Sequence, residues 1–300
     1  MLFIETNDYD GVQASVQKLV SLPFEDTTIT GLTIICSILY VTSKLSRVII
    51  GYDLTTFAVK LQLPVIGLSN PSDVKHWMHN GLCIFDMKSD AQPKEILILF
   101  DLSRKTIQNR WSTGDDYGSI SVTDKGNVIL TVHNKHVLKE YESDGQVIRE
   151  IVLSSRIFKP LHSLKLTSGH FLVSYGLRSG ICIVDENGTI LKSFVDDRDS
   201  WLRPSDPVCL TVDSSGSIMV ADKTTGRVLL FSPTLEFQKQ LISPLRGLKS
   251  PVKIHLDESD GSRLFVIDDD LKSGIHVFKF GKSIVAELLS ICAYNLAVSF

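Results

Sequence analysis

The chain has 300 residues, 43% of them hydrophobic and 22% charged, with a formal net charge of -3 at pH 7. That many apolar residues can form a large core, in one big domain or two smaller ones. The near-neutral balance excludes a protein that binds polyanions through its overall charge. The segment MLFIETNDYD has no basic start and reaches an acidic residue early, so it is not expected to be a secretory signal peptide.

The cysteines favour a reducing compartment. Their number is odd, no two form a C-x-x-C pair, and most lie inside apolar runs: Cys36, Cys83, Cys182, Cys209 and Cys292. Buried free thiols explain this distribution better than a disulfide framework does. A cytoplasmic location is therefore expected.

The first predicted element is a strand at residues 15–22, SVQKLVSL, which has no partner strands before it. It has the pattern of an outer strand such as QVIREIVL. We expect it to pair beside residues 276–280 and complete the last sheet of the chain. The competing choice for this role is SIVAELLS at residues 283–290, which follows that last sheet directly.

From residue 31 onward a unit of four short strands repeats at an interval of about 45 residues. In each of the six copies the second strand is centred on an apolar residue, in chain order Val41, Ile84, Leu130, Val173, Val220 and Val266. Asp144-Gly145 and Asn187-Gly188 fall between the third and fourth strands, where a tight turn needs positive φ. The predicted units are 31–63, 72–111, 119–153, 162–195, 207–242 and 251–280.

Six such copies predict an all-β, six-bladed β-propeller with four-stranded antiparallel blades. A β-solenoid or a pair of sandwiches is the weaker alternative, because solenoid coils are usually shorter and sandwiches give no reason for equal periods. Residues 281–300 then form a C-terminal tail. This tail is apolar but contains Glu287 and Asn295 and is barely long enough to span a bilayer, so no membrane segment is expected.

The fifth unit resembles the NHL repeat. It opens with Pro207, continues with an Asp-x-x-Gly turn and the strand SIMVAD, and ends its small polar turn at Arg227 in RVLLF. The sixth unit, from Pro251 through RLFVID to HVFKF, is similar. The resemblance covers roughly residues 31–280 and implies a propeller like the C-terminal one of tripartite-motif proteins.

Related propellers bind proteins or single-stranded RNA, so the resemblance implies a non-enzymatic binding or scaffold role. The zinc modules and coiled coil that precede such propellers are missing from this sequence. Ubiquitin-ligase activity is therefore not carried over. The chain is expected to be either a free-standing propeller or a fragment of a longer tripartite-motif-type protein.

Metal-dependent hydrolase or lyase chemistry in the axial channel is the alternative function, since some NHL-like propellers carry it. Such a site needs His or carboxylate ligands at equivalent inner-strand positions, and we assign to those positions Ser119, Ser163, Cys209 and Lys253. The pairs His76/His79 and His133/His136 fall at strand ends or turns, where i and i+3 point to opposite faces. Asp268 to Asp270 is interpreted as a solvated turn. We therefore predict no catalytic residue, cofactor or metal ligand.

Charge is distributed unevenly between the loops. Those joining second to third strands, and those between blades, should emerge on one face of a propeller. Seven basic residues of these loops are the predicted partner-binding set: Lys44, Arg47, Lys135, Arg178, Lys223, Arg227 and Lys272.

Trp111 and Trp201 lie close to the same face and would suit base stacking in RNA. A purely structural role remains the alternative for Arg47 and Arg227, and aspartates such as Asp196 and Asp206 partly offset the basic charge.

Overall fold

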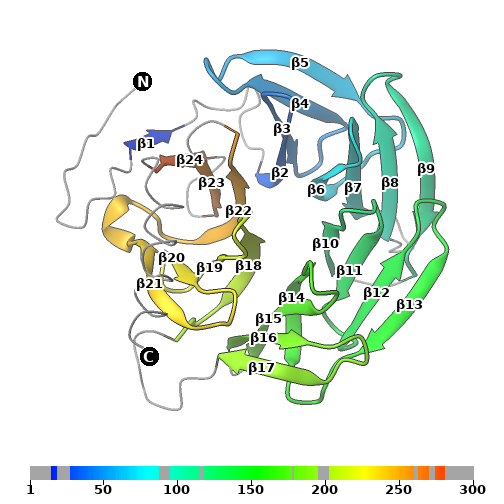
Figure 1. Ribbon diagram of the computed structural model, residues 1–300. Helices are drawn as coiled ribbons and strands as arrows, with labels where there is room; N and C mark the ends of the chain where they lie inside the picture. The colour runs from blue at the N-terminus through cyan, green and yellow to red at the C-terminus, as the bar shows by residue number, and fades with distance from the viewer. Residues whose placement is uncertain are drawn as a thin grey trace.

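The computed structural model describes residues 15–18, 28–87, 95–114, 118–177, 179–194, 203–259, 263–269 and 274–280. These residues form six four-stranded antiparallel sheets arranged around a central axis (Figure 1). The predicted six-bladed propeller is confirmed. Among the described residues, no helix is long and apolar enough to cross a bilayer.

The first three blades follow one another along the chain. The first consists of β2 (Ile29–Ile35), β3 (Ile38–Ser43), β4 (Val48–Asp53) and β5 (Val59–Pro64). The second consists of β6 (Pro71–Trp77), β7 (Gly81–Met87), β8 (Glu95–Asp101) and β9 (Thr106–Ser112). The third consists of β10 (Gly118–Val122), β11 (Val128–Val132), β12 (Val137–Tyr141) and β13 (Val147–Val152).

The remaining blades continue the same order. The fourth contains β14 (Phe158–Lys165), β15 (Phe171–Leu177), β16 (Gly180–Val184) and β17 (Ile190–Phe194). The fifth contains β18 (Pro207–Val212), β19 (Ile218–Asp222), β20 (Arg227–Phe231) and β21 (Phe237–Ile242). The sixth contains β22 (Pro251–Asp257), β23 (Arg263–Asp268), β24 (Gly274–Lys279) and β1 (Ser15–Lys18).

The N-terminal strand closes the ring. β1 pairs antiparallel with β24, with Ser15 opposite Lys279 and Lys18 opposite His276. This pairing gives the outer edge of the sixth blade a partner, as the sequence predicts for part of residues 15–22. Residues 19–22 and the competing segment 283–290 lie outside the described residues.

Burial explains why the strands of a blade differ in sequence. The second strands lie between two neighbouring blades and are almost entirely buried, and β11 and β19 are buried throughout. Outer strands such as β9 alternate between partly buried and exposed side chains. Apolar clusters cross from blade to blade, for example between Val41 of the first blade and Phe265 of the sixth. The core is therefore the set of interfaces between blades.

The chain direction defines the two faces of the disc. Each inner strand starts at a loop between blades, so these loops share one face with the loops joining second to third strands. Backbone hydrogen bonds connect the two kinds of loop, as from Lys223 N to the Asp206 carbonyl at 2.9 Å. We call this side the loop face. The inner strands end at the opposite face.

Aspartates near the ends of three second strands fix the loop face. Asp86, Asp222 and Asp268 each accept hydrogen bonds from two consecutive backbone N–H groups of the loop entering the same blade. A carboxylate satisfies such donors strongly because the bonds are charge-assisted. These aspartates therefore hold each incoming loop to its blade.

Candidate functional site: the axial channel and the loop face

The inner strands place two sets of six residues around the axis. Strand register makes the residues of each set equivalent. The upper ring, nearer the loop face, comprises Gly31, Asp73, Ser119, His162, Cys209 and Lys253. The lower ring, two residues further along each strand, comprises Thr33, Lys75, Ser121, Leu164, Thr211 and His255.

Asp73 is the centre of the charged part of the channel. It is buried, its Oδ2 lies 2.6 Å from Lys253 Nζ, and its Oδ1 lies 3.3 Å from Lys75 Nζ. Burial works to raise the pKa of Asp73, but Lys253 and Lys75 outweigh it and the pKa is lowered. Burial likewise works to lower the pKa of Lys253, and Asp73 outweighs it in the opposite direction. Asp73 and Lys253 are therefore both charged near neutral pH.

Gly31 makes room for this ion pair. Asp73 belongs to the second blade and Lys253 to the sixth, and the first blade stands between them in the ring. A Cβ on Gly31 would lie 2.8 Å from Asp73 Cα and 2.9 Å from Asp73 Oδ1. Only a residue without a side chain lets Lys253 reach across the first blade.

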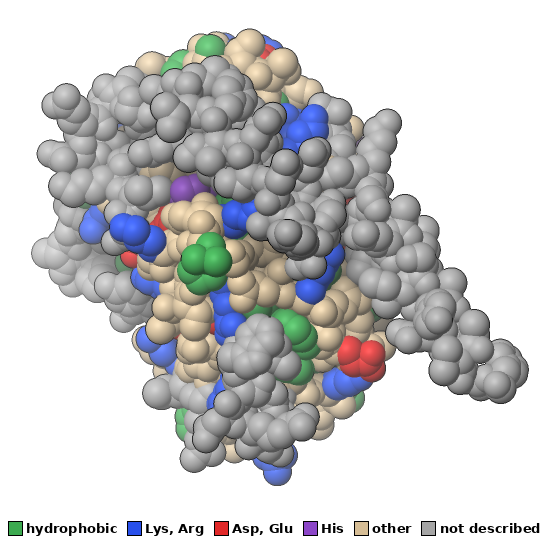
Figure 2. All heavy atoms as spheres, turned by 90° about the vertical axis from the view of Figure 1, so that its left-hand side faces the viewer, with side chains coloured by type: hydrophobic (Ala, Val, Ile, Leu, Met, Phe, Trp, Pro, Cys, Tyr) green, Lys and Arg blue, Asp and Glu red, His purple; other side chains and the backbone are tan. Residues whose placement is uncertain are grey.

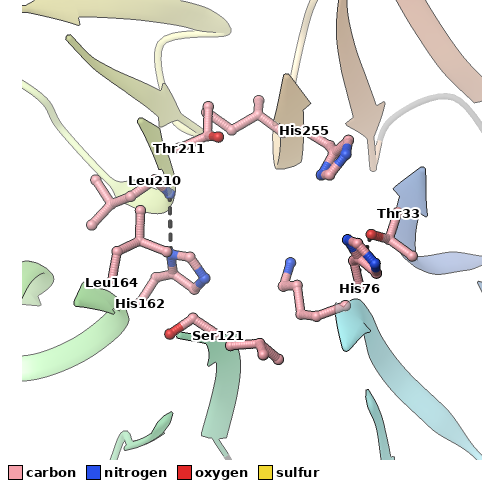
Figure 3. A pocket seen from close by; sticks show the side chains of 11 residues that line it. Thr33, His76, Ser121, His162, Leu164, Leu210, Thr211 and His255 are labelled. Atoms are coloured by element: carbon pink, nitrogen blue, oxygen red, sulfur yellow. Dashed lines mark hydrogen bonds between the residues drawn. The ribbon is translucent and has the colours of Figure 1, made fainter. Parts of the chain in front are cut away.

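His162 supplies a polar atom without a partner. Its side chain is 1% exposed, and its Nδ1 accepts a hydrogen bond from Leu210 N at 3.2 Å. Because Nδ1 is the acceptor, the proton of the neutral ring is on Nε2. Nε2 is buried, and although the Ile120 backbone acts on the ring, no hydrogen bond of ordinary geometry reaches Nε2 from the described residues. Figure 3 shows the ring turned toward the middle of the channel.

Buried His162 and the partly buried His255 and His133 are held neutral. Burial lowers the pKa of His162 to about 3, and the charges of Lys75 and Lys253 lower it further, while Asp73 and the Ile120 backbone oppose the fall. Burial also lowers the pKa of His255 to about 4, with Lys75 acting in the same direction. His133, which hydrogen-bonds the Leu161 carbonyl through Nε2 at 2.8 Å, has its pKa lowered to about 4, chiefly by burial.

A cavity of about 170 Å³ occupies this part of the channel. All six blades contribute to its wall, which contains the whole lower ring together with His76, Val122, His162, Leu210 and Ile254. Figure 3 shows Thr33, His76, Ser121 and His255 around the same space. Most of these residues lie in the second halves of their inner strands, so the cavity lies away from the loop face.

The donor set of the channel does not resemble a metal site. The single carboxylate of the upper ring, Asp73, is already paired with Lys75 and Lys253. Within the part of the chain that the structure describes, no group of three or more His, Cys, Asp or Glu side chains is placed to hold a metal ion. His133 and His136 bond two different backbone carbonyls rather than converging.

Sequence reasoning missed most of this cluster. It placed Ser163 at the channel position that His162 occupies, an error of one residue, and Ser163 instead bonds Thr131 Oγ1 at 2.7 Å. It did not single out Asp73, Lys75 or His255. The available signal was the register: Asp73 and His162 each stand 11 positions before the centre of their second strand, as Ser119 and Cys209 do in the third and fifth blades.

The predicted basic residues fall into three groups. Lys44, Arg47 and Lys135 are exposed on the loop face. Lys223 is half-buried, with its Nζ 3.0 Å from Asp269 Oδ2. Arg178 and Lys272, like Trp201 and the aspartates at 196–199, lie outside the described residues.

Arg227 is buried rather than exposed. Its Nε lies 3.0 Å from Asp222 Oδ2, and its Nη2 donates to the Arg203 carbonyl at 2.8 Å. Its charge is therefore used inside the fifth blade, which is the structural role that the sequence left open. Trp111 is likewise half-buried, packed against Tyr141 with ring centroids 5.9 Å apart, so it is not free for base stacking.

Two adjacent loops of the first blade form a mixed basic and apolar surface. Leu45 is 67% exposed and Ile66 is 85% exposed, next to Lys44 and Arg47. Val65 N donates to the Arg47 carbonyl at 3.2 Å, which joins the two loops. We call Lys44, Leu45, Arg47 and Ile66 the loop patch.

The rim of the disc has a different character. Figure 2, which faces the side carrying β20 and β21, shows Lys and Arg side chains at several separate places with apolar ones between them. No continuous basic field is seen among the described atoms of this side.

The fold is shared with solved propellers of different roles. No protein-family model and no curated protein matches the chain. Virginiamycin B lyase from Staphylococcus aureus superposes with a TM-score of 0.64 at 12% identity, covering 89% of this chain and 99% of that one. The WD40 propeller domain of Doa1 gives 0.63 at 13% identity, covering 91% of this chain and 90% of that one.

A protein of unknown function from Bacteroides caccae gives a TM-score of 0.60 at 12% identity, covering 83% of this chain and 96% of that one. At such identities the likeness shows the fold alone. The class is thus defined: the chain is a six-bladed β-propeller resembling virginiamycin B lyase.

Proposed function

We propose that the chain is a non-enzymatic binding propeller that engages a protein partner through the loop patch. The observation that carries the proposal is the pairing of exposed Leu45 and Ile66 with Lys44 and Arg47 on two joined loops. Large exposed apolar side chains ringed by charge are typical of interaction surfaces. Related NHL propellers of tripartite-motif proteins, which the fifth and sixth blades resemble, support the same role in the cytoplasm.

The expected partner is a protein segment that combines acidic and apolar residues. Basic side chains of the patch would attract it, and the two aliphatic side chains would bury its apolar positions. Single-stranded RNA is favoured less, because aliphatic side chains cannot stack on bases and Trp111 is packed into the third blade's interface.

Selection from a random peptide library tests this proposal with the purified chain. We expect recovered peptides to be enriched in Asp and Glu beside large apolar residues. The double variant Leu45→Glu/Ile66→Glu should lose at least tenfold in affinity for them. The matched control Val152→Glu/Leu191→Glu changes two exposed apolar side chains on outer strands and should bind as the parent does.

Two outcomes would reject the protein version. One is equal peptide binding by the patch variant and the control. The other is salt-dependent binding of single-stranded RNA oligonucleotides that is lost in Lys44→Glu/Arg47→Glu, which would assign the patch to RNA instead.

A further inference from the structure

We propose that the axial cavity is a binding site for a small oxyanion, the carboxylate or phosphate group of a small molecule. This site is separate from the loop patch and does not depend on the function proposed for it. Charge balance is the first argument. Lys75 and Lys253 carry two positive charges and share one negative charge on Asp73.

The excess positive charge lies where little water reaches it, so leaving it unpaired is energetically unfavourable. Lys75 and Lys253 have side chains only 16% and 20% exposed. An unbalanced ammonium group in such surroundings is stabilised by an anion, because the interaction is less screened than in water. No Asp or Glu side chain is among the described residues that line the cavity. Asp257, the nearby carboxylate that acts on His255, is bound by Arg263 at 2.8 Å.

Unpartnered polar atoms at the cavity wall are the second argument. His162 Nε2 carries a proton because its Nδ1 accepts from Leu210. The Ile120 backbone acts on the ring, but among the described residues no hydrogen bond of ordinary geometry joins it to Nε2. The buried Ser121 Oγ, on the neighbouring blade, also has none. Buried polar groups are normally satisfied, so two such atoms facing one cavity indicate a missing partner. Both can donate, as can Lys75, and an oxyanion accepts from several donors at once.

The size of the cavity restricts the ligand. Pockets for whole drug-sized molecules measure about 300–1,000 Å³. The observed 170 Å³ admits a single small group or a very small molecule. Carboxylate and phosphate share the chemistry that the wall recognises, and the experiment separates them.

Calorimetric titration of the purified chain with sodium phosphate and, in a second arm, sodium acetate tests the site. Sodium chloride at equal ionic strength is the reference. We expect one of the two oxyanions to bind saturably and to raise the melting temperature beyond the chloride value. Lys75→Gln should weaken this binding at least tenfold. Lys60→Gln, which removes an exposed lysine of the outer strand β5, should leave it unchanged.

The proposal is overturned if neither oxyanion binds more tightly than chloride, or if Lys75→Gln binds as well as the parent. If Lys75→Gln fails to fold, histidine ring NMR of the parent decides. The bound oxyanion should shift the signals of His162 and His255 and leave exposed His79 in place. Equal shifts at all histidines, or none, would reject the site.

Discussion

At the residue scale, the channel shows how a propeller can keep charges in a largely buried place. Because Gly31 has no side chain, Lys253 can extend past the first blade to Asp73. Asp73 thus binds the ammonium groups of both Lys253 and Lys75. A buried ion pair of this kind is not itself a large source of stability, because desolvation opposes it. Its effect is to fix one arrangement of groups around the cavity.

The neutral histidines predict a stability that depends on pH. In the unfolded chain a histidine titrates near pH 6.5, whereas the pKa of His162 in the folded chain is about 3. Between these values the unfolded state binds more protons, so the free energy of unfolding falls as pH is lowered. From pH 7 to pH 5 we expect His162 alone to account for about 2 kcal/mol of that loss.

Urea unfolding of the parent and of His162→Gln at several pH values between 7 and 5 measures this effect. Carboxylates with ordinary pKa values titrate mainly below this window, so they contribute little. The variant should show a flatter dependence than the parent, and His79→Gln, which changes an exposed histidine, should follow the parent. Parallel curves for the parent and His162→Gln would contradict the neutral, buried state of this ring.

At the scale of elements, an aspartate fastens the second, fifth and sixth blades to the loops that enter them. In the fifth blade Asp222 accepts from Ser205 N and Asp206 N, and Arg227 bonds both Asp222 and the Arg203 carbonyl. One buried pair thus joins β19, β20 and the loop before β18. Asp86 and Asp268 perform the loop-holding part of this role in the second and sixth blades.

Arg227→Met is therefore expected to destabilise the chain rather than to affect a partner surface. Removing one member of a buried pair leaves the other charge uncompensated, which costs about 3–5 kcal/mol. Lys223→Met, a neighbouring change at a half-exposed lysine, should cost less than about 1 kcal/mol. Urea unfolding compares the two, and equal midpoints would show that the Arg227 pair has no such role.

At the scale of the whole molecule, the ring is closed by two ends of the chain. β1 provides the outer strand of the sixth blade, so the N-terminal segment completes a sheet whose other strands come last in the sequence. Closure leaves two separate faces. The cavity lies toward one end of the channel and the loop patch lies on the loop face, so a small ligand and a protein partner need not compete.

Deleting residues 1–22 should open the ring at this seam. The loss of the β1–β24 pairing exposes a row of backbone donors and acceptors on β24, and we expect a loss of several kcal/mol, given about 0.5–1.5 kcal/mol per hydrogen bond. Deleting residues 284–300 should lower the free energy of unfolding much less. Urea unfolding of both truncated chains decides, and a larger loss from the C-terminal truncation would reverse the assignment.

The sequence by itself determined the repeat, the number of blades and the strand order, and it favoured residues 15–22 over residues 283–290 as the closing strand. These follow from local patterns: alternating or continuous apolar runs, turn residues at fixed intervals, and one outer-strand pattern left over at residues 15–22. Strand and turn preferences act over a few residues, so a single sequence displays them. The regular period then repeats the same information six times.

Only the tertiary structure decided what the channel contains and which basic residues are exposed. Asp73 and Lys253 are 180 positions apart, and they meet because ring closure and the bare backbone of Gly31 bring them together. A one-residue difference in register placed His162 rather than Ser163 in the upper ring. Arg227 is withdrawn from solvent by Asp222, its direct partner on the adjacent strand, and by the Arg203 carbonyl of the loop before β18. The contact between Asp73 and Lys253 depends on the packing of whole blades, and no local pattern encodes it.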